Sequence, residues 1–179
     1  MRRLLLLRHA KAAAGEPDID RPLTSQGRRA AALVGEHLAK HELLPDRILC
    51  SSSRRTRETF AALVAHLRAD TDVKLSRLLY EAGNGHYLDQ IGRYGATAQT
   101  LLVVGHNPAM QETAALLIGA GNTDLRDEVA NRFPTAGLAV IDFDRAKWDD
   151  IAPRSGRIVA FFRPRDLEIV GGEKGGAEA

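Results

Sequence analysis

The sequence is poor in several features that would point to particular classes of protein. Its 179 residues include one cysteine, Cys50, so no internal disulfide can form. Aromatic residues make up 5% of the chain, and 25 Lys and Arg against 23 Asp and Glu give a formal charge of +2. A protein that binds single-stranded nucleic acid usually needs stacking aromatics and a clustered basic surface. We therefore expect no nucleic-acid partner.

Long apolar runs are also absent from the sequence. No stretch approaches the roughly 20 apolar residues that a membrane-spanning helix needs. The chain begins with Met1, two arginines and four leucines, which looks like the start of a signal peptide, but Arg8 and His9 interrupt the apolar stretch too early. We expect no membrane association and a cytoplasmic location, where a lone cysteine stays reduced.

What the chain does contain is an alternation of short apolar runs and amphipathic segments. Hydrophobic residues make up 44% of the sequence, enough for one α/β domain with a sizeable core. Apolar runs predict strands, the last two of them as a hairpin-like pair, at residues 3–7, 47–50, 73–75, 101–104, 138–143 and 157–162. Periodic apolar positions predict helices at residues 25–41, 54–68, 87–94 and 109–118.

This order of elements predicts the fold class. Strands that alternate with helices form a mostly parallel sheet with helices on both faces. The chain is therefore expected to be an α/β protein built as a three-layer α/β/α sandwich. Residues 1–170 are expected to form a single domain. Residues 171–179 lack large apolar side chains and predict a flexible C-terminal tail.

Two of the predicted strands end in histidine. The run of leucines from residue 4 leads directly to Arg8 and His9, and the run over residues 100–104 leads to Gly105 and His106. In a parallel α/β sheet, ligands bind just beyond the carboxyl ends of the strands. Arginine offers phosphate a planar, charged fork, and a neutral imidazole can act as a nucleophile. Both histidines therefore point to one crevice with chemistry suited to phosphate.

A third strand end adds hydroxyl and guanidinium groups. The predicted strand at residues 47–50 is followed by three serines and then by Arg54, Arg55 and Arg57. This pattern is typical of a strand that leads into a helix N-terminus, where backbone N–H groups favour anions. Each of these strand ends alone could also be a set of solvated polar residues. Their occurrence in order along one chain favours a phosphate site.

Five segments of the chain resemble the histidine phosphatase superfamily, and most of all its small SixA-type phosphohistidine phosphatases. The segments contain an Arg-His pair, the run Asp-Arg-Pro-Leu-Thr, an Arg-x-x-x-Thr spacing and a Gly-His-Asn-Pro turn, and they cover residues 5–11, 20–27, 51–59, 104–108 and 133–140. The resemblance implies the phosphoglycerate-mutase-like form of the α/β/α sandwich.

The resemblance also implies roles for the matching residues. His9 is the expected nucleophile, which would take up the phosphoryl group and form a phosphohistidine that water then hydrolyses. Arg8, Arg55 and His106 would hold the non-bridging oxygens of that group. Arg55 is chosen among the neighbouring arginines because it alone keeps the family's spacing to Thr59. This chemistry requires no metal and no cofactor.

Two further assignments have alternatives. Arg21 is expected either to add a phosphate contact or to help Asp20 and Thr24 organise the turn into the first long helix. Glu81 is the predicted general acid, because larger relatives carry their catalytic glutamate at this place; it could equally be a surface carboxylate. A protonated imidazole is a good leaving group, so a phosphohistidine substrate would depend less on such an acid.

Three functions are compatible with these residues. The predicted function is a metal-independent phosphohistidine phosphatase in signalling, with a histidine-phosphotransfer domain or a phosphocarrier protein as its substrate. It is favoured because residues 82–99 leave room for one short helix, where relatives acting on small metabolites insert a lid. The first alternative is a phosphatase for small phosphate esters or nucleotides. The second is a non-catalytic phosphate-binding module, which the presence of His9, Arg8 and Arg55 disfavours.

Overall fold

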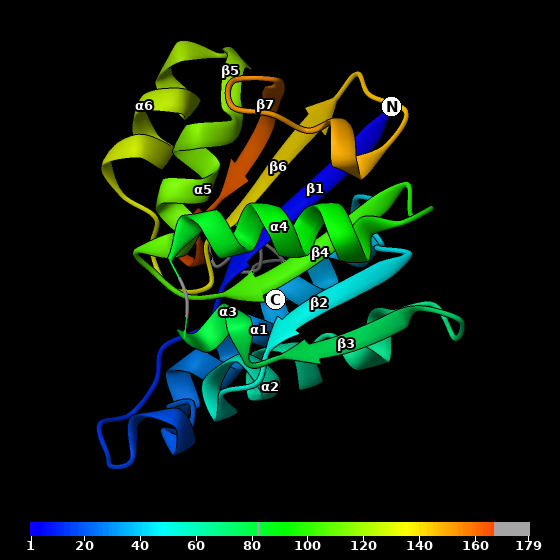
Figure 1. Cartoon of the computed structure of the whole chain (residues 1–179). Helices are drawn as coiled ribbons and strands as arrows, with labels where there is room; N and C mark the ends of the chain where they lie inside the picture. The colour runs from blue at the N-terminus through cyan, green and yellow to red at the C-terminus, as the bar shows by residue number, and fades with distance from the viewer. Residues whose placement is uncertain (82, 167–179) are drawn as a thin grey trace, which may run out of the picture.

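One seven-stranded sheet forms the centre of the protein in the computed structural model, which describes residues 1–81 and 83–166. The strand order is β3-β2-β4-β1-β6-β7-β5. In chain order the strands are β1 (Arg2–Arg8), β2 (Arg47–Ser51), β3 (Asp72–Ser76), β4 (Thr100–Gly105), β5 (Ile118–Gly121), β6 (Leu138–Phe143) and β7 (Gly156–Phe162). The arrows of β1, β2, β3 and β4 point toward the same edge of the sheet (Figure 1).

Helices cover both faces of this sheet (Figure 1). The α-helices are α1 (Ser25–Lys40), α2 (Arg54–Ala61), α3 (Leu78–Glu81), α4 (Asn84–Gly95), α5 (Ala109–Leu117) and α6 (Thr123–Asn131). Short 3-10 turns are η1 (Asp18–Asp20), η2 (Val64–His66) and η3 (Trp148–Asp150). Within the described ranges, none of the helices is long and apolar enough to cross a bilayer.

The four leucines of β1 explain why this strand lies at the centre. Leu4 and Leu6 belong to the core shared with α4 and α5, whereas Leu5 and Leu7 belong to the core shared with α1. All four side chains are fully buried. Burying a leucine contributes about 1.5–3 kcal/mol, so this run strongly fixes the position of β1. The polar residues that follow are thereby held at the end of a central strand.

The predicted α/β/α sandwich is confirmed, but the sheet is mixed rather than mostly parallel. Neighbouring pairs among β1 to β4 are parallel, and β5 pairs with β7 in parallel. Strand β6 runs antiparallel to both β1 and β7. The predicted pairing of residues 138–143 with residues 157–162 is correct. The first strand of this pair, β6, is the one that runs against both of its neighbours in the sheet. The tail expected at residues 171–179 lies outside the described residues.

Several details of the secondary structure differ from the sequence-based expectation. The helix predicted for residues 54–68 ends at Ala61, and the 3-10 turn η2 then follows the buried Leu63. Strand β5 was not predicted, because its sequence Ile-Gly-Ala-Gly shows no alternation of apolar and polar residues. Helix α6 was also missed, since Val129 is its one buried residue and no apolar stripe is visible.

Candidate active site

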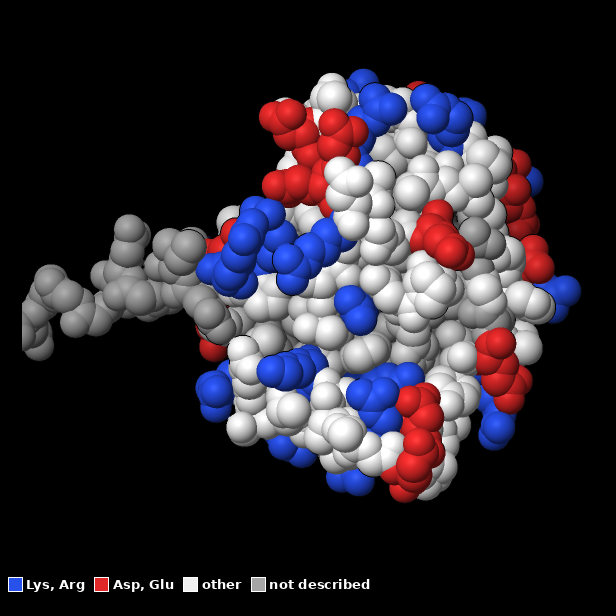
Figure 2. Space-filling model, turned by 90° about the vertical axis from the view of Figure 1, so that its left-hand side faces the viewer, with Lys and Arg blue, Asp and Glu red and all other residues white. Residues whose placement is uncertain are grey.

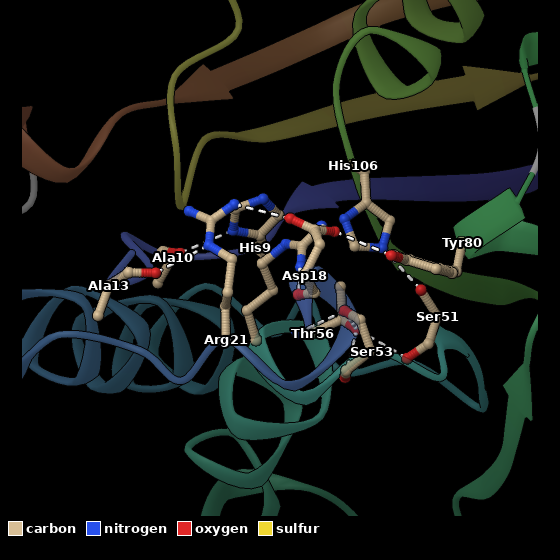
Figure 3. A network of polar contacts seen from close by, with 11 residues as sticks. His9, Ala10, Ala13, Asp18, Arg21, Ser51, Ser53, Thr56, Tyr80 and His106 are labelled. Carbon is tan, nitrogen blue, oxygen red and sulfur yellow. Dashed lines mark hydrogen bonds and ion pairs between the residues drawn. The ribbon is translucent and has the colours of Figure 1, made fainter. Parts of the chain in front are cut away.

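The side chains that follow β1, β2 and β4 form a network of polar contacts at the carboxyl edge of the sheet (Figure 3). Figure 2 shows the protein from this side, with Lys and Arg side chains around and within a pale central area and acidic side chains next to some of them. The segments that supply the network are far apart in the sequence. The sheet brings them together because the carboxyl ends of parallel strands meet at one edge.

His9 is buried, and one of its ring nitrogens is already engaged. Nδ1 lies 2.7 Å from the carbonyl oxygen of Ala10. A carbonyl only accepts hydrogen bonds, so Nδ1 carries the ring proton and Nε2 keeps its lone pair. Burial is the main cause that lowers the pKa of His9 to about 4, and the positive charges of Arg55 and Arg8 act in the same direction. His9 is therefore neutral at pH 7, with Nε2 able to act as a nucleophile.

His106 is held beside His9 by contacts from two other segments. Its backbone N–H donates to the phenol oxygen of Tyr87 at 3.0 Å, and its ring Nε2 lies 2.7 Å from Ser51 Oγ. Gly105 makes room for this phenol, since a Cβ at residue 105 would lie 2.3 Å from the Tyr87 oxygen. The ring centroids of His9 and His106 are 5.3 Å apart. The rings of the two histidines therefore lie close together at this edge of the sheet.

The contact between His106 and Ser51 is compatible with either tautomer of the ring, because a hydroxyl can both donate and accept. The other ring nitrogen, Nδ1, is buried and makes no hydrogen bond with any residue in the described part of the chain. Burial, with a smaller contribution from His9, lowers the pKa of His106 to about 3, so the ring is neutral. When the Ser51 hydroxyl donates to Nε2, the proton of the neutral ring lies on Nδ1. His106 can then donate to an anion without being charged.

Arg55 enters the site from the first turn of α2. The side chain of Ser53 caps this helix by accepting from the backbone N–H of Thr56. Thr59 accepts from the N–H of Ala10 at 3.0 Å and donates to the carbonyl of Arg55 at 2.7 Å. This double contact ties α2 to the end of β1, and it explains why an arginine and a threonine are spaced four residues apart. The exposed Arg54 points away to Glu58.

Arg8 is half-buried on the opposite side of the site. Its Nη1 donates to the carbonyl of Phe133 at 2.8 Å, and the side-chain amide of Asn107 donates to the same oxygen at 3.1 Å. Burial lowers the pKa of Arg8 below its usual value, although guanidinium groups remain charged in proteins. The turn at residues 133–137 thus orients Arg8 and is linked to the Gly-His-Asn-Pro motif through Asn107.

Arg21 and two residues that the sequence did not single out complete the network. Arg21 donates to the carbonyl of Ala13 at 2.8 Å and to Asp18 Oδ1 at 3.0 Å. Tyr80 donates its hydroxyl to Asp18 Oδ2 at 2.9 Å, and its ring lies 5.7 Å from that of His106. Arg21 therefore braces its loop, and its charge also helps to lower the pKa of His9.

Glu81 lies apart from this network. It is the last residue of α3, its side chain is exposed, and it forms an ion pair with Arg77. The neighbouring Tyr80 is the residue of α3 that reaches His106. A general acid would have to leave the contact with Arg77 to reach a substrate beside His9.

No metal centre accompanies the site in residues 1–81 and 83–166, where no three His, Cys, Asp or Glu side chains are grouped to hold an ion. The one thiol, Cys50, is buried in β2, and burial raises its pKa to about 12. What the arrangement offers is a neutral imidazole with a free lone pair, a second imidazole able to donate, and three guanidinium groups. This set can bind a phosphoryl group and attack it.

Comparison with known proteins assigns the chain to a family. Residues 4–90 match the sequence profile of the histidine phosphatase superfamily (branch 1). The chain belongs to the histidine phosphatase superfamily, as its motifs predicted. Its mixed α/β/α sandwich is the phosphoglycerate-mutase-like fold expected from the resemblance.

Individual relatives cover nearly the whole chain. The structure of a proposed phosphohistidine phosphatase SixA from Nakamurella multipartitia is 32% identical, with a TM-score of 0.80 over 91% of this chain and 96% of that one. A proposed phosphohistidine phosphatase SixA from Agrobacterium tumefaciens is also 32% identical, with a TM-score of 0.74 over 91% and 98%. An uncharacterised protein of Mycobacterium tuberculosis is 36% identical over 163 residues, which are 89% of this chain and 100% of the relative.

Proposed function

We propose that the chain is a phosphatase that transfers the phosphoryl group of its substrate first to His9 and then to water. In the first step, the lone pair of His9 Nε2 attacks phosphorus, a P–N bond forms, and the bond to the leaving group breaks. In the second step, a water oxygen bonds to phosphorus, the P–N bond breaks, and phosphate is released. The hydrogen bond from Nδ1 to Ala10 supports this role, because it leaves Nε2 unprotonated.

The observation that carries the proposal is a set of buried donors on residues that flank His9. Nε of Arg8, Nε of Arg55 and Nδ1 of His106 are buried and make no hydrogen bond with the residues that the structure describes. Leaving such a donor unpaired costs about 1–3 kcal/mol. A phosphoryl group has three non-bridging oxygens that can accept from these donors. We therefore assign Arg8, Arg55 and His106 to holding the phosphoryl group, with Arg21 as a further contact.

The proposed substrate is a phosphohistidine on a protein, in a histidine-phosphotransfer domain or a phosphocarrier. Two relatives at 32% identity are described as phosphohistidine phosphatases, which favours this substrate class. The structure of residues 84–95 also supports this substrate class. These residues form α4, which packs Tyr87 and Ile91 into the core, and so they form part of the sandwich rather than a lid over His9. A site without such a lid would admit a phosphorylated side chain on a protein surface.

A phosphohistidine substrate reduces the need for an acid. Its leaving group is an imidazole, which departs readily once it is protonated, whereas an alkoxide needs a proton from the enzyme. We keep Glu81 as the candidate acid for ester substrates only. The positive charge for the reaction comes from Arg8, Arg21 and Arg55, so we propose a reaction without metal or cofactor. We further propose a signalling role in the cytoplasm, where a lone cysteine such as Cys50 stays reduced.

The test compares two substrates under the same conditions. Phosphate release is measured from a phosphohistidine protein and from an aryl phosphate ester, with the unmodified protein, with His9→Asn, and with His86→Asn as the control. His86 is an exposed residue of α4 and has no part in the network. We expect rapid release from phosphohistidine, little from the ester, loss of both with His9→Asn, and no change with His86→Asn.

The other outcomes identify the alternatives. Faster release from the ester would favour a phosphatase for small phosphate esters or nucleotides and would make Glu81 the acid to test next. Absence of turnover on both substrates, with phosphate still bound, would favour the non-catalytic binding module. Release that persists in His9→Asn would contradict the proposed nucleophile.

A further inference from the structure

A carboxylate lies inside the group of arginines that the site offers to phosphate. Asp18 Oδ1 accepts from Arg21 Nη1 at 3.0 Å, and Asp18 Oδ2 lies 3.2 Å from Arg55 Nη2. The Tyr80 hydroxyl donates to the same Oδ2 at 2.9 Å (Figure 3). The backbone carbonyl of Asp18 accepts from Arg55 Nη1 at 2.9 Å. Asp18 thus contacts two guanidinium groups and a phenol that surround the site of the proposed reaction.

The loop that carries Asp18 is closed on itself, so the carboxylate is held in this position. An antiparallel bridge joins Ala12 to Leu23, and the N–H of Ala13 donates to the carbonyl of Pro22 at 2.8 Å. The base of the loop is tied to α2, because Glu58 accepts from the N–H of Leu23 at 2.8 Å. These contacts fix both ends of the segment between residues 12 and 23, and η1 places Asp18 over Arg55.

The contacts exclude a role for Asp18 as a proton donor. Its hydrogen bonds with Arg21 and Tyr80 are the main cause that lowers the pKa of Asp18 to about 2, and Arg55 adds to the effect. The carboxylate is therefore ionised at pH 7 and has no proton to give to a leaving group. The Asp18 carboxylate instead places a negative charge beside the position that the negatively charged phosphoryl group of the substrate would occupy.

We propose that Asp18 is a built-in counter-anion that holds Arg21 and Arg55 together and weakens the binding of free phosphate at this site. Arg8, Arg21 and Arg55 carry three positive charges, and the carboxylate offsets one of them. Phosphate at neutral pH carries between one and two negative charges, so the remaining positive charge matches it closely. Without Asp18 the site would bind its own product too tightly. The inference about product release rests on the proposed phosphatase function. The effect of Asp18 on the binding of free phosphate does not depend on that function.

The experiment measures the dissociation constant of inorganic phosphate by isothermal titration calorimetry at constant ionic strength. Asp18→Asn keeps the shape and removes the charge, and Asp18→Glu keeps the charge. Glu16→Gln is the matched control, because Glu16 is an exposed acid of the same loop. Removing one charge near a bound anion is expected to lower the dissociation constant roughly tenfold in Asp18→Asn. Asp18→Glu and Glu16→Gln should stay near the value of the unmodified protein.

Turnover of a phosphohistidine protein is then measured with the same variants. In Asp18→Asn we expect kcat and KM to fall together and added phosphate to inhibit more strongly, as slower product release requires. Phosphate binding that is unchanged or weaker in Asp18→Asn would overturn the proposal. Tighter binding in Asp18→Asn, combined with no turnover by the unmodified protein, would support the counter-anion and refute the phosphatase function.

Discussion

Mild acid should destabilise the protein through the neutral histidines of the site. The pKa of His9 is lowered from 6.5 to about 4, mainly by burial, and that of His106 to about 3. An unfolded chain takes up a proton on each of these residues as the pH falls below 6.5, whereas the folded protein does not until the pH reaches the lower value. The contribution of these neutral histidines to the free energy of unfolding is therefore fully present above pH 6.5, and it is lost as the pH falls toward 4.

The size of this effect follows from the two pKa values of each residue. Between pH 7 and pH 5, a histidine with a pKa of 6.5 unfolded and about 4 folded reduces the free energy of unfolding by about 2 kcal/mol. The same calculation for His106 also gives about 2 kcal/mol. The substitution His9→Asn removes one of these contributions. The free energy of unfolding of this variant should then fall by about 2 kcal/mol less than that of the unmodified protein.

The assay is urea unfolding at both pH values, followed by the fluorescence of Trp148. This residue is the one tryptophan of the sequence, and it is buried with 2% of its surface exposed, so its emission reports the native fold. The exposed His86→Asn serves as the control and should follow the unmodified protein. An identical pH dependence in His9→Asn and the unmodified protein would refute the reasoning, because His9 would then titrate alike in both states.

Three further predictions concern single side chains. Thr59→Val removes the hydroxyl that pairs with the N–H of Ala10, so the free energy of unfolding should fall by about 1–3 kcal/mol and phosphatase activity should fall with it. Ser51→Ala frees Nε2 of His106, so kcat/KM should fall roughly tenfold while KM changes less, and the nitrogen NMR signals of this ring should show a changed tautomer. Glu81→Gln should leave the hydrolysis of a phosphohistidine protein unchanged, because the leaving imidazole needs no strong acid.

Each of these predictions has an outcome that contradicts it. Unchanged stability of the Thr59→Val variant would mean that the buried N–H finds another partner, and Thr113→Val, at a buried threonine of α5 outside the site, is the control. Full activity of Ser51→Ala would show that the tautomer of His106 does not depend on Ser51. A large loss of phosphohistidine hydrolysis with Glu81→Gln would make Glu81 an acid for this substrate too.

The site residues that directly follow central strands could be predicted from the sequence. The apolar runs that end in His9 and His106 are long enough to show two buried strands, and parallel strands bring their carboxyl ends to one edge. Arg55 was chosen because it keeps the family's Arg-x-x-x-Thr spacing to Thr59, and in the structure one helical turn separates the two residues. These residues are placed by periodic elements, and periodicity is visible in a sequence.

Asp18 and Tyr80 could not be predicted in the same way. Asp18 lies in a loop whose position depends on a bridge and on hydrogen bonds to α2, none of which leaves a periodic pattern. Tyr80 lies in the short helix α3 beside Glu81, and packing decides which of the two reaches His106. The antiparallel pairing of β6 with β1 was missed for a related reason, since an apolar run does not reveal the direction of its neighbour.

The most direct test of the account is to look for the phosphoryl group on His9. The protein is mixed with a 32P-labelled phosphohistidine protein, quenched within milliseconds in alkali, and digested for mass spectrometry; His9→Asn is treated in parallel. The account predicts a transient, acid-labile phosphoryl group on the peptide that contains His9, formed and lost at the rate of turnover, and none in the variant. Turnover without this intermediate, or a phosphoryl group on another residue, would contradict it.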